Sequence, residues 1–192
     1  MNVDPNPFVA QGYGDLKPWL DLVNSEHWDG FGIFTDMLDN PQWVKSFMHF
    51  WKFRNPSKEP FPRTEFRALR ALIRTMVETA SSGGNKLHLE QLASLNDWMK
   101  VPVTPKLEET PGGLRISLRI AQSGWKETLG NITFSFAQSL IDHGQTRLRI
   151  CQNNDCRWIF IDNSKGNVRR WCNTATCGNR ERVRKARASK KR

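Results

Sequence analysis

The first 150 residues of this 192-residue chain contain no cysteine. All four cysteines follow within a short C-terminal stretch, at positions 151, 156, 172 and 177. A secreted protein held together by disulfides normally distributes its cysteines through its core. Clustering at one end of a chain without an export signal therefore favours metal binding over disulfide bonds.

The sequence also lacks the segments that mark membrane insertion or export. No apolar run approaches the roughly 18 residues of a membrane-spanning helix. The N-terminal MNVDPNPFVAQGYGD has neither a basic region nor the apolar region that follows it in a secretory signal. We therefore expect a soluble cytoplasmic protein with no membrane partner.

Common enzyme signatures are missing: the chain contains no P-loop, GxGxxG, HExxH or GxSxG motif. We therefore do not expect an enzyme. Two polar residues, Asp21 and Asn24, interrupt an otherwise apolar helix. They could line a ligand pocket for a small-molecule effector, or they could satisfy a buried backbone group.

What the chain does contain is apolar bulk. Eight tryptophans and eleven phenylalanines supply the surface for a folded core. Apolar residues at helical spacing predict helices over about 41–53, 64–80, 89–99 and 128–143. Strict alternation over 114–120, preceded by Thr-Pro-Gly-Gly, predicts a half-buried strand that forms a β-hairpin with residues 101–109. Residues 1–146 are thus expected to form a mostly helical domain with a small antiparallel hairpin.

Positive charge is concentrated at the C-terminal end. Residues 147–192 hold 14 lysines and arginines against three acidic residues, a net charge of +11, whereas residues 1–146 carry −1. Such asymmetry indicates a polyanion-binding module attached to a nearly neutral body, although a basic tail that only aids solubility is the alternative.

The cysteines follow the pattern C-x4-C-x15-C-x4-C. Two close pairs separated by a longer spacer are typical of a four-cysteine zinc site, because each pair directs two thiolates at one point. We expect one zinc ion bound by Cys151, Cys156, Cys172 and Cys177. Four protein ligands leave no position for water, so the expected role is structural rather than catalytic.

The flanks of the cysteines predict how this module folds. Alternating runs at 147–150 and 158–161 should form a hairpin with the first cysteine pair in its turn, and the sequence becomes helical from about residue 174. These are the parts of a treble-clef-like finger. The complete chain is therefore expected to be α+β, with a helical domain over 1–146 and a zinc finger with a basic C-terminal helix over 147–192.

The finger region resembles the CGNR zinc-finger family. The tetrapeptide Cys177-Gly178-Asn179-Arg180 gives that family its name, and the pattern Asp-x-Ser-x4-Arg-Arg-Trp-Cys ends at Cys172. Upstream, residues 19–24 and Leu95-Asn96 resemble the ABATE domain that usually precedes this finger. Residues 25–30, Ser-Glu-His-Trp-Asp-Gly, depart from the plainer continuation expected there.

The resemblance implies a bacterial transcription regulator that binds DNA through its finger. Charge density in and beside the C-terminal helix predicts the same partner, with these nucleic-acid contacts: Arg169, Arg170, Arg180, Arg182, Arg184, Lys185 and Arg187. For Arg169 and Arg170 the alternative is that one of them pairs with Asp162 and holds the finger together. The N-terminal domain would then sense a ligand or form a homodimer. The alternative is a zinc-stabilised protein-interaction or RNA-binding module that does not recognise a DNA sequence.

Overall fold

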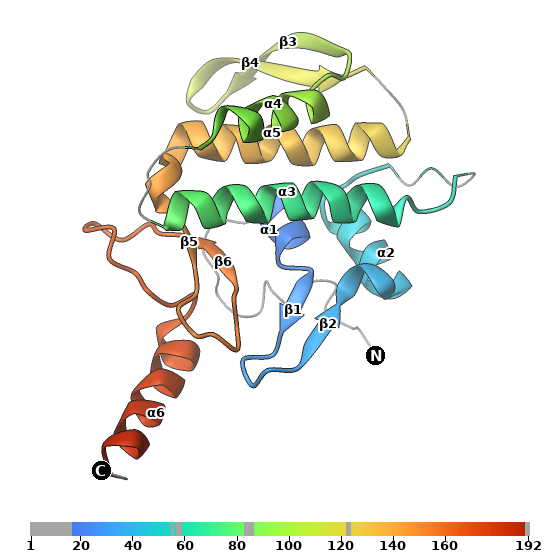
Figure 1. Ribbon diagram of the computed structural model, residues 1–192. Coiled ribbons are helices and arrows are strands. Elements are labelled where there is room, and N and C mark those ends of the chain that lie inside the picture. Colours follow the sequence, from blue (N-terminus) through green and yellow to red (C-terminus); the bar gives the residue numbers. More distant parts are fainter. Residues whose placement is uncertain (1–16, 55, 57–58, 83–86, 122–123, 191–192) are drawn as a thin grey trace.

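The computed structural model describes residues 17–54, 56, 59–82, 87–121 and 124–190 (Figure 1). Helices form the body of the molecule, and three two-stranded antiparallel sheets surround them in the described residues. The α+β class expected from the sequence is confirmed. In the described residues, no helix is long and apolar enough to cross a membrane.

Three helices meet in the centre of the core: α1 (Pro18–Val23), α3 (Arg63–Ser81) and α5 (Trp125–His143). Trp19 of α1 is fully buried, and its ring lies edge-on to Phe136 of α5 with 5.0 Å between the centroids. Its indole Nε1 donates to Ser139 Oγ at 2.8 Å, so the polar atom of the buried ring is satisfied. This contact fixes the short helix α1 against the long helix α5.

Two further helices were predicted and are present, α2 (Pro41–Phe50) and α4 (Leu89–Trp98). The start of α2 follows from local chemistry. Asn40 Oδ1 accepts from the backbone N–H groups of Gln42 and Trp43, and Pro41 occupies the first helical position, where a missing N–H costs nothing. Between α1 and α2 the chain forms a short 3-10 turn, η2 (Met37–Asp39).

The predicted hairpin of β3 (Val103–Thr110) and β4 (Gly113–Ile120) is present, with Leu107 opposite Ile116. The prediction that its apolar side is half-buried is wrong within the single chain. Leu114, Ile116 and Leu118 remain 73%, 68% and 52% exposed. Alternation correctly predicted that one side is apolar, but it could not show whether another part of the same chain covers that side.

A second hairpin, β1 (Glu26–Trp28) and β2 (Phe34–Asp36), was not expected. Its two base residues are held by buried arginines of α3. Both terminal nitrogens of Arg70 donate to the Asp36 carboxylate at 2.7 and 2.8 Å, and Arg74 Nε lies 2.7 Å from Glu26 Oε2. These ion pairs anchor the base of the hairpin to the body, and its loop projects away from the body (Figure 1).

The C-terminal hairpin, β5 (Leu148–Ile150) and β6 (Ile159–Ile161), follows a short turn, η3 (Gln145–Arg147). Leu148 and Ile159 are fully buried in the same apolar cluster as the helices. Ser81 Oγ at the end of α3 donates to the Leu148 carbonyl at 2.9 Å. The core is therefore continuous across residue 146. The final helix, α6 (Asn179–Ser189), extends away from the body (Figure 1).

Candidate metal centre and nucleic-acid interface

The first cysteine pair lies in the turn of the β5–β6 hairpin. Cys151 N donates to the Trp158 carbonyl at 2.8 Å, which closes the hairpin around the turn. Within it, Cys156 N donates to the Asn153 carbonyl at 2.9 Å, and Arg157 adopts a positive φ of 53°. This tight reversal brings Cys151 and Cys156 to the same side of the hairpin.

The second pair is placed by a turn before the last helix. Asn173 Oδ1 accepts from Thr176 N at 3.1 Å and opens a π-helical turn, η4 (Thr174–Gly178), which carries Cys177. Gly178 follows directly, and a Cβ there would lie 2.9 Å from the Trp171 ring. A glycine is thus required for the turn to pack against Trp171.

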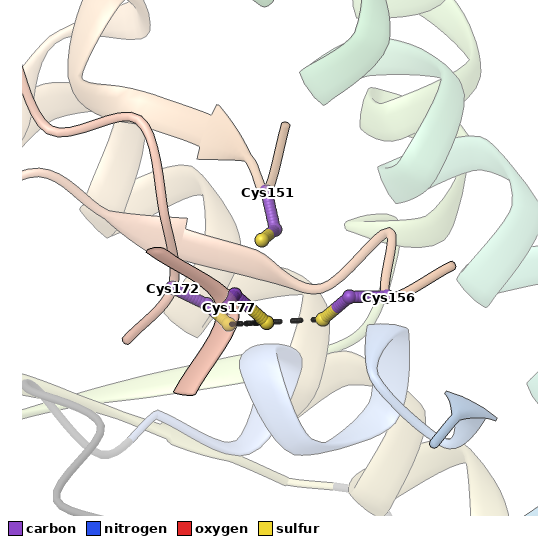
Figure 2. A group of neighbouring side chains, drawn as sticks. All are labelled: Cys151, Cys156, Cys172 and Cys177. Atoms are coloured by element: carbon purple, nitrogen blue, oxygen red, sulfur yellow. Dashed lines mark hydrogen bonds between the residues drawn. The ribbon is translucent and has the colours of Figure 1, made fainter. Parts of the chain in front are cut away.

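All four sulfur atoms converge on one point (Figure 2). The Sγ atoms of Cys151, Cys156, Cys172 and Cys177 lie within 4.8 Å of one another, and the Cys156–Cys172 and Cys172–Cys177 separations are 3.7 Å. Tetrahedral zinc with Zn–S bonds of about 2.3 Å requires sulfur separations of about 3.8 Å. None of the four cysteines forms a disulfide. The arrangement fits one structural zinc ion.

Crowding makes the four thiols unequal. Hydrogen bonding, first from Cys151 and then from Cys156 and Cys172, lowers the pKa of the Cys177 thiol. The Asn153 amide nitrogen, 3.7 Å from Cys177 Sγ, acts in the same direction. Contact with Cys151 is the largest cause that raises the pKa of Cys156 and of Cys172. Four adjacent thiolates cannot form together unless a cation balances them, and zinc supplies that charge.

Arg169 is directed into the finger. Its Nε donates to the Trp171 carbonyl at 2.9 Å, another guanidinium nitrogen contacts the Cys172 carbonyl, and the guanidinium lies 4.7 Å from the Phe160 ring centroid. The backbone N–H of Arg169 donates to the fully buried Asp162 carboxylate at 2.9 Å. The structure thus uses Arg169 to position the loop that carries Cys172.

The remaining predicted nucleic-acid contacts lie at or near α6. Arg170 donates to Gln152 Oε1 at 2.6 Å but stays exposed, and Arg180 is half-buried. Arg184 is 55% exposed and pairs with the buried Glu181 at 2.7 Å. Three further cations of the helix are exposed: Arg182, Lys185 and Arg187. The helix therefore presents a dense positive surface beside the metal centre.

Asp21 and Asn24 are both committed to protein partners. The Asn24 side chain donates to the Ile159 carbonyl at 2.9 Å and accepts from Ile159 N at 2.8 Å. Asp21 accepts from Trp51 Nε1 at 2.8 Å. Asn24 satisfies a buried backbone group, which was the alternative to a ligand pocket, and it joins α1 to the finger hairpin.

The C-terminal region is a zinc finger fused to a helical body, and comparison with known families gives the same result. Residues 147–190 match the CGNR zinc finger, and residues 16–142 match ABATE, described as a putative stress-induced transcription regulator. Since the second match covers more than half of the chain, the protein belongs to the ABATE family. Both expected resemblances are therefore confirmed. No curated protein matches the chain.

Sequence reasoning did not find every residue of the site. The Asn153 amide, which contacts Cys177, lies inside the first cysteine turn, and the only available signal was its position between two ligands. Phe31 was missed because the β1–β2 hairpin was not expected. Arg180 of α6 stacks on Phe31, with 4.1 Å from its guanidinium carbon to the ring centroid, and donates to the Asp29 carbonyl at 3.2 Å.

Proposed function

We propose that this protein is a zinc-dependent, DNA-binding transcription regulator of the bacterial cytoplasm. The observation that carries the proposal is the position of α6. This exposed basic helix leaves the four-cysteine cluster directly, because Cys177 lies in the turn that precedes it. A metal-fixed start sets the direction of the helix before binding, which suits entry into a groove.

Fewer residues are proposed to contact DNA than were expected from the sequence. Arg169 braces the Cys172 loop and Arg180 is held by the β1–β2 hairpin, so neither guanidinium is fully available to phosphate. The proposed contacts are the exposed cations Arg170, Arg182, Arg184, Lys185 and Arg187. Zinc has a structural role, and we assign no catalytic role to the protein.

The test is selection of bound sequences from a random duplex pool by the zinc-loaded protein. We expect one enriched motif and no enrichment after chelation, because the direction of α6 depends on the metal. The RNA-binding or protein-interaction alternative predicts that duplex DNA, single-stranded RNA and heparin compete equally and that no motif is enriched. That outcome would exclude a sequence-specific regulator.

For the N-terminal domain we propose dimerisation, because the β3–β4 hairpin has an uncovered apolar side. Leu107, Leu114 and Ile116 are each more than 60% exposed, whereas the ion pairs of Glu108 lie on the opposite side. This face is apolar except for Glu109, which lies opposite Leu114 near the turn. A mostly apolar face can pair with its own copy, and two such faces pack about 10 Å apart in a sandwich.

Sedimentation velocity tests this role directly. The wild-type chain should sediment as a dimer, and Ile116→Arg should give monomers because it places a charge in the interface. Thr104→Arg lies on the opposite side of the same hairpin and should leave the dimer intact. A wild-type monomer at all concentrations would reject dimerisation without affecting the DNA-binding proposal. The sensing of a small-molecule effector stays an alternative role for this domain.

A further inference from the structure

The loop of the β1–β2 hairpin has a defined shape although it is exposed. Asp29 Oδ1 accepts from the backbone N–H groups of Phe31 and Ile33, at 2.7 and 3.1 Å. Gly30 and Gly32 take positive φ angles of 83° and 98°, which permit this tight path. The loop is therefore preorganised, and its base is anchored by the buried arginines of α3.

This ordered loop presents apolar side chains to solvent. Phe31 is 74% exposed and Ile33 is 66% exposed, while Phe34 is 48% exposed and its ring packs at a tilt against Trp28, with 5.1 Å between centroids. Exposed aromatic and branched residues on a rigid projection indicate a contact surface rather than a solvated loop. Phe31 is the middle one of the five residues that connect the two strands.

The same loop touches the start of α6. Arg180 bridges the two by its stacking on Phe31 and its hydrogen bond to the Asp29 carbonyl. The contact is close, since a Cβ on Gly30 would lie 1.8 Å from an Arg180 nitrogen. The loop and α6 both project from the same end of the molecule (Figure 1). A polyanion bound at the first turn of α6 would therefore lie close to Phe31.

From this juxtaposition we propose that the β1–β2 loop is a second DNA-contacting element, in which Phe31 inserts as an apolar wedge at a base step while α6 binds the phosphates. The proposal rests on the DNA-binding function above and adds a role for the N-terminal domain in it. Apolar side chains such as Phe and Ile unstack base steps and bend duplexes when neighbouring cations hold the backbone.

Duplex DNA fits this surface better than a membrane does. A helix that lies in a lipid interface pairs its cations with a broad face of large apolar residues. The apolar residues of α6 are Val183 and two small residues, Ala186 and Ala188. Nucleic acid combines phosphate for α6 with base faces for Phe31, and it needs no apolar face on the helix.

The experiment uses the full zinc-loaded chain and an A·T-rich duplex that carries 2-aminopurine in place of several adenines. Unstacking at TA steps, which open most easily, raises the fluorescence of this base. Phe31→Ala should abolish the rise and weaken binding about tenfold, the order expected for one lost stacking contact. Because no phosphate contact is lost, the slope of log affinity against log salt should not change. Arg182→Ala should instead flatten that slope by about one.

Two variants separate wedge insertion from a merely structural effect. Phe31→Leu keeps an apolar wedge but removes the stacking with Arg180, so it should retain most of the fluorescence rise. Leu89→Ala removes an 84% exposed apolar side chain from α4, at the opposite side of the body, and should change nothing. The contradicting outcome is that Phe31→Leu loses the fluorescence rise as Phe31→Ala does, together with a flatter slope of log affinity against log salt. In that case Phe31 acts only by positioning Arg180, and the wedge is rejected.

The remaining outcomes distinguish this inference from the proposed function. If the Arg182→Ala result is as expected and Phe31→Ala binds like the wild type, the wedge alone is rejected. If the wild-type chain does not prefer duplex to heparin, the proposed function fails and the wedge fails with it. If Phe31→Ala weakens binding to phosphatidylserine vesicles but not to duplex, the surface is a lipid contact and the inference is overturned.

Discussion

Asp36 is the residue on which the base of the β1–β2 hairpin depends. Its side chain is 10% exposed and receives Arg70 through two hydrogen bonds, while Arg67 adds a third at 3.0 Å. Burial by itself would raise the pKa of Asp36. The hydrogen bonds and positive charge of Arg70 oppose this effect, and hydrogen bonds from Leu38 N and Arg67 add to them, so the pKa is lowered to about 2. A carboxylate with a lowered pKa stabilises the fold at neutral pH.

We predict that Asp36→Asn lowers the free energy of unfolding by about 3 kcal/mol at pH 7, because it leaves Arg70 buried without its main counter-ion. The unfolded carboxyl titrates near pH 3.9, so the contribution is complete above that pH and is lost as pH falls toward about 2. The wild type and variant should therefore converge between pH 4 and pH 2 in urea titrations.

The matched control is Asp39→Asn, which removes a 58% exposed carboxylate that also binds Arg67. Surface pairs of this kind contribute less than about 1 kcal/mol. An equal loss from both variants, or a constant Asp36→Asn deficit across the acid range, would contradict the role given to Asp36.

Asn24 is the second residue with a testable role, because it satisfies both backbone groups of Ile159. We predict that Asn24→Ala costs about 2–3 kcal/mol of stability, since it leaves a buried N–H and a buried carbonyl without partners. Loosening of β6 should also speed the transfer of zinc to a chelator. Asn154→Ala, at an exposed position in the first cysteine turn, is the control, and unchanged unfolding in Asn24→Ala would contradict this account.

At the scale of single residues, the sequence predicted the metal ligands better than it predicted the nucleic-acid contacts. Paired spacing identified the four cysteines because metal geometry constrains where ligands can lie in a chain. Charge alone could not separate Arg169, which turns into the finger, from Arg182, which stays exposed. That distinction depends on backbone carbonyls whose positions only the folded loop determines.

At the scale of elements, helices were predictable where caps and periodicity agree. Asn40-Pro41 opens α2 as expected, and Gly144 ends α5. The β1–β2 hairpin was not predictable, because its strands have three residues each and show little alternation. Long-range ion pairs to α3 hold it in place, and no local pattern encodes them.

The elements of the finger should respond differently to loss of zinc. Leu148 and Ile159 of the β5–β6 hairpin are buried against the helical body. By contrast, α6 is joined to the rest of the molecule chiefly through η4, which carries Cys177, and through Arg180. We predict that chelation removes hydrogen-exchange protection from η4 and α6 but leaves β6 and α3 protected. Cys172→Ser should reproduce the chelated pattern. Protection that persists in α6, or that disappears throughout α3, would contradict this division.

On the scale of the whole molecule, residues 1–146 form a nearly neutral body, and the excess positive charge lies in residues 147–192. The body provides a core that is continuous with the finger hairpin, so the metal centre is rigidly placed. The charge distribution of the sequence predicted a neutral segment and a basic segment with a net charge of +11, but it could not show that the two segments share one core. That sharing depends on Asn24 and Ser81, whose partners lie more than 60 residues away.

The central claim is that a zinc-fixed basic helix binds duplex DNA, and the salt dependence of binding tests it most directly. Anisotropy of a labelled duplex should give a slope of log affinity against log salt of about −4 for the zinc-loaded chain, as expected for four or five phosphate contacts. In Lys185→Ala the slope should become less steep by about one, to about −3, because one phosphate contact is lost. Single-stranded RNA and heparin should compete poorly. Binding that is equal for all three polyanions and unchanged by chelation would contradict the claim.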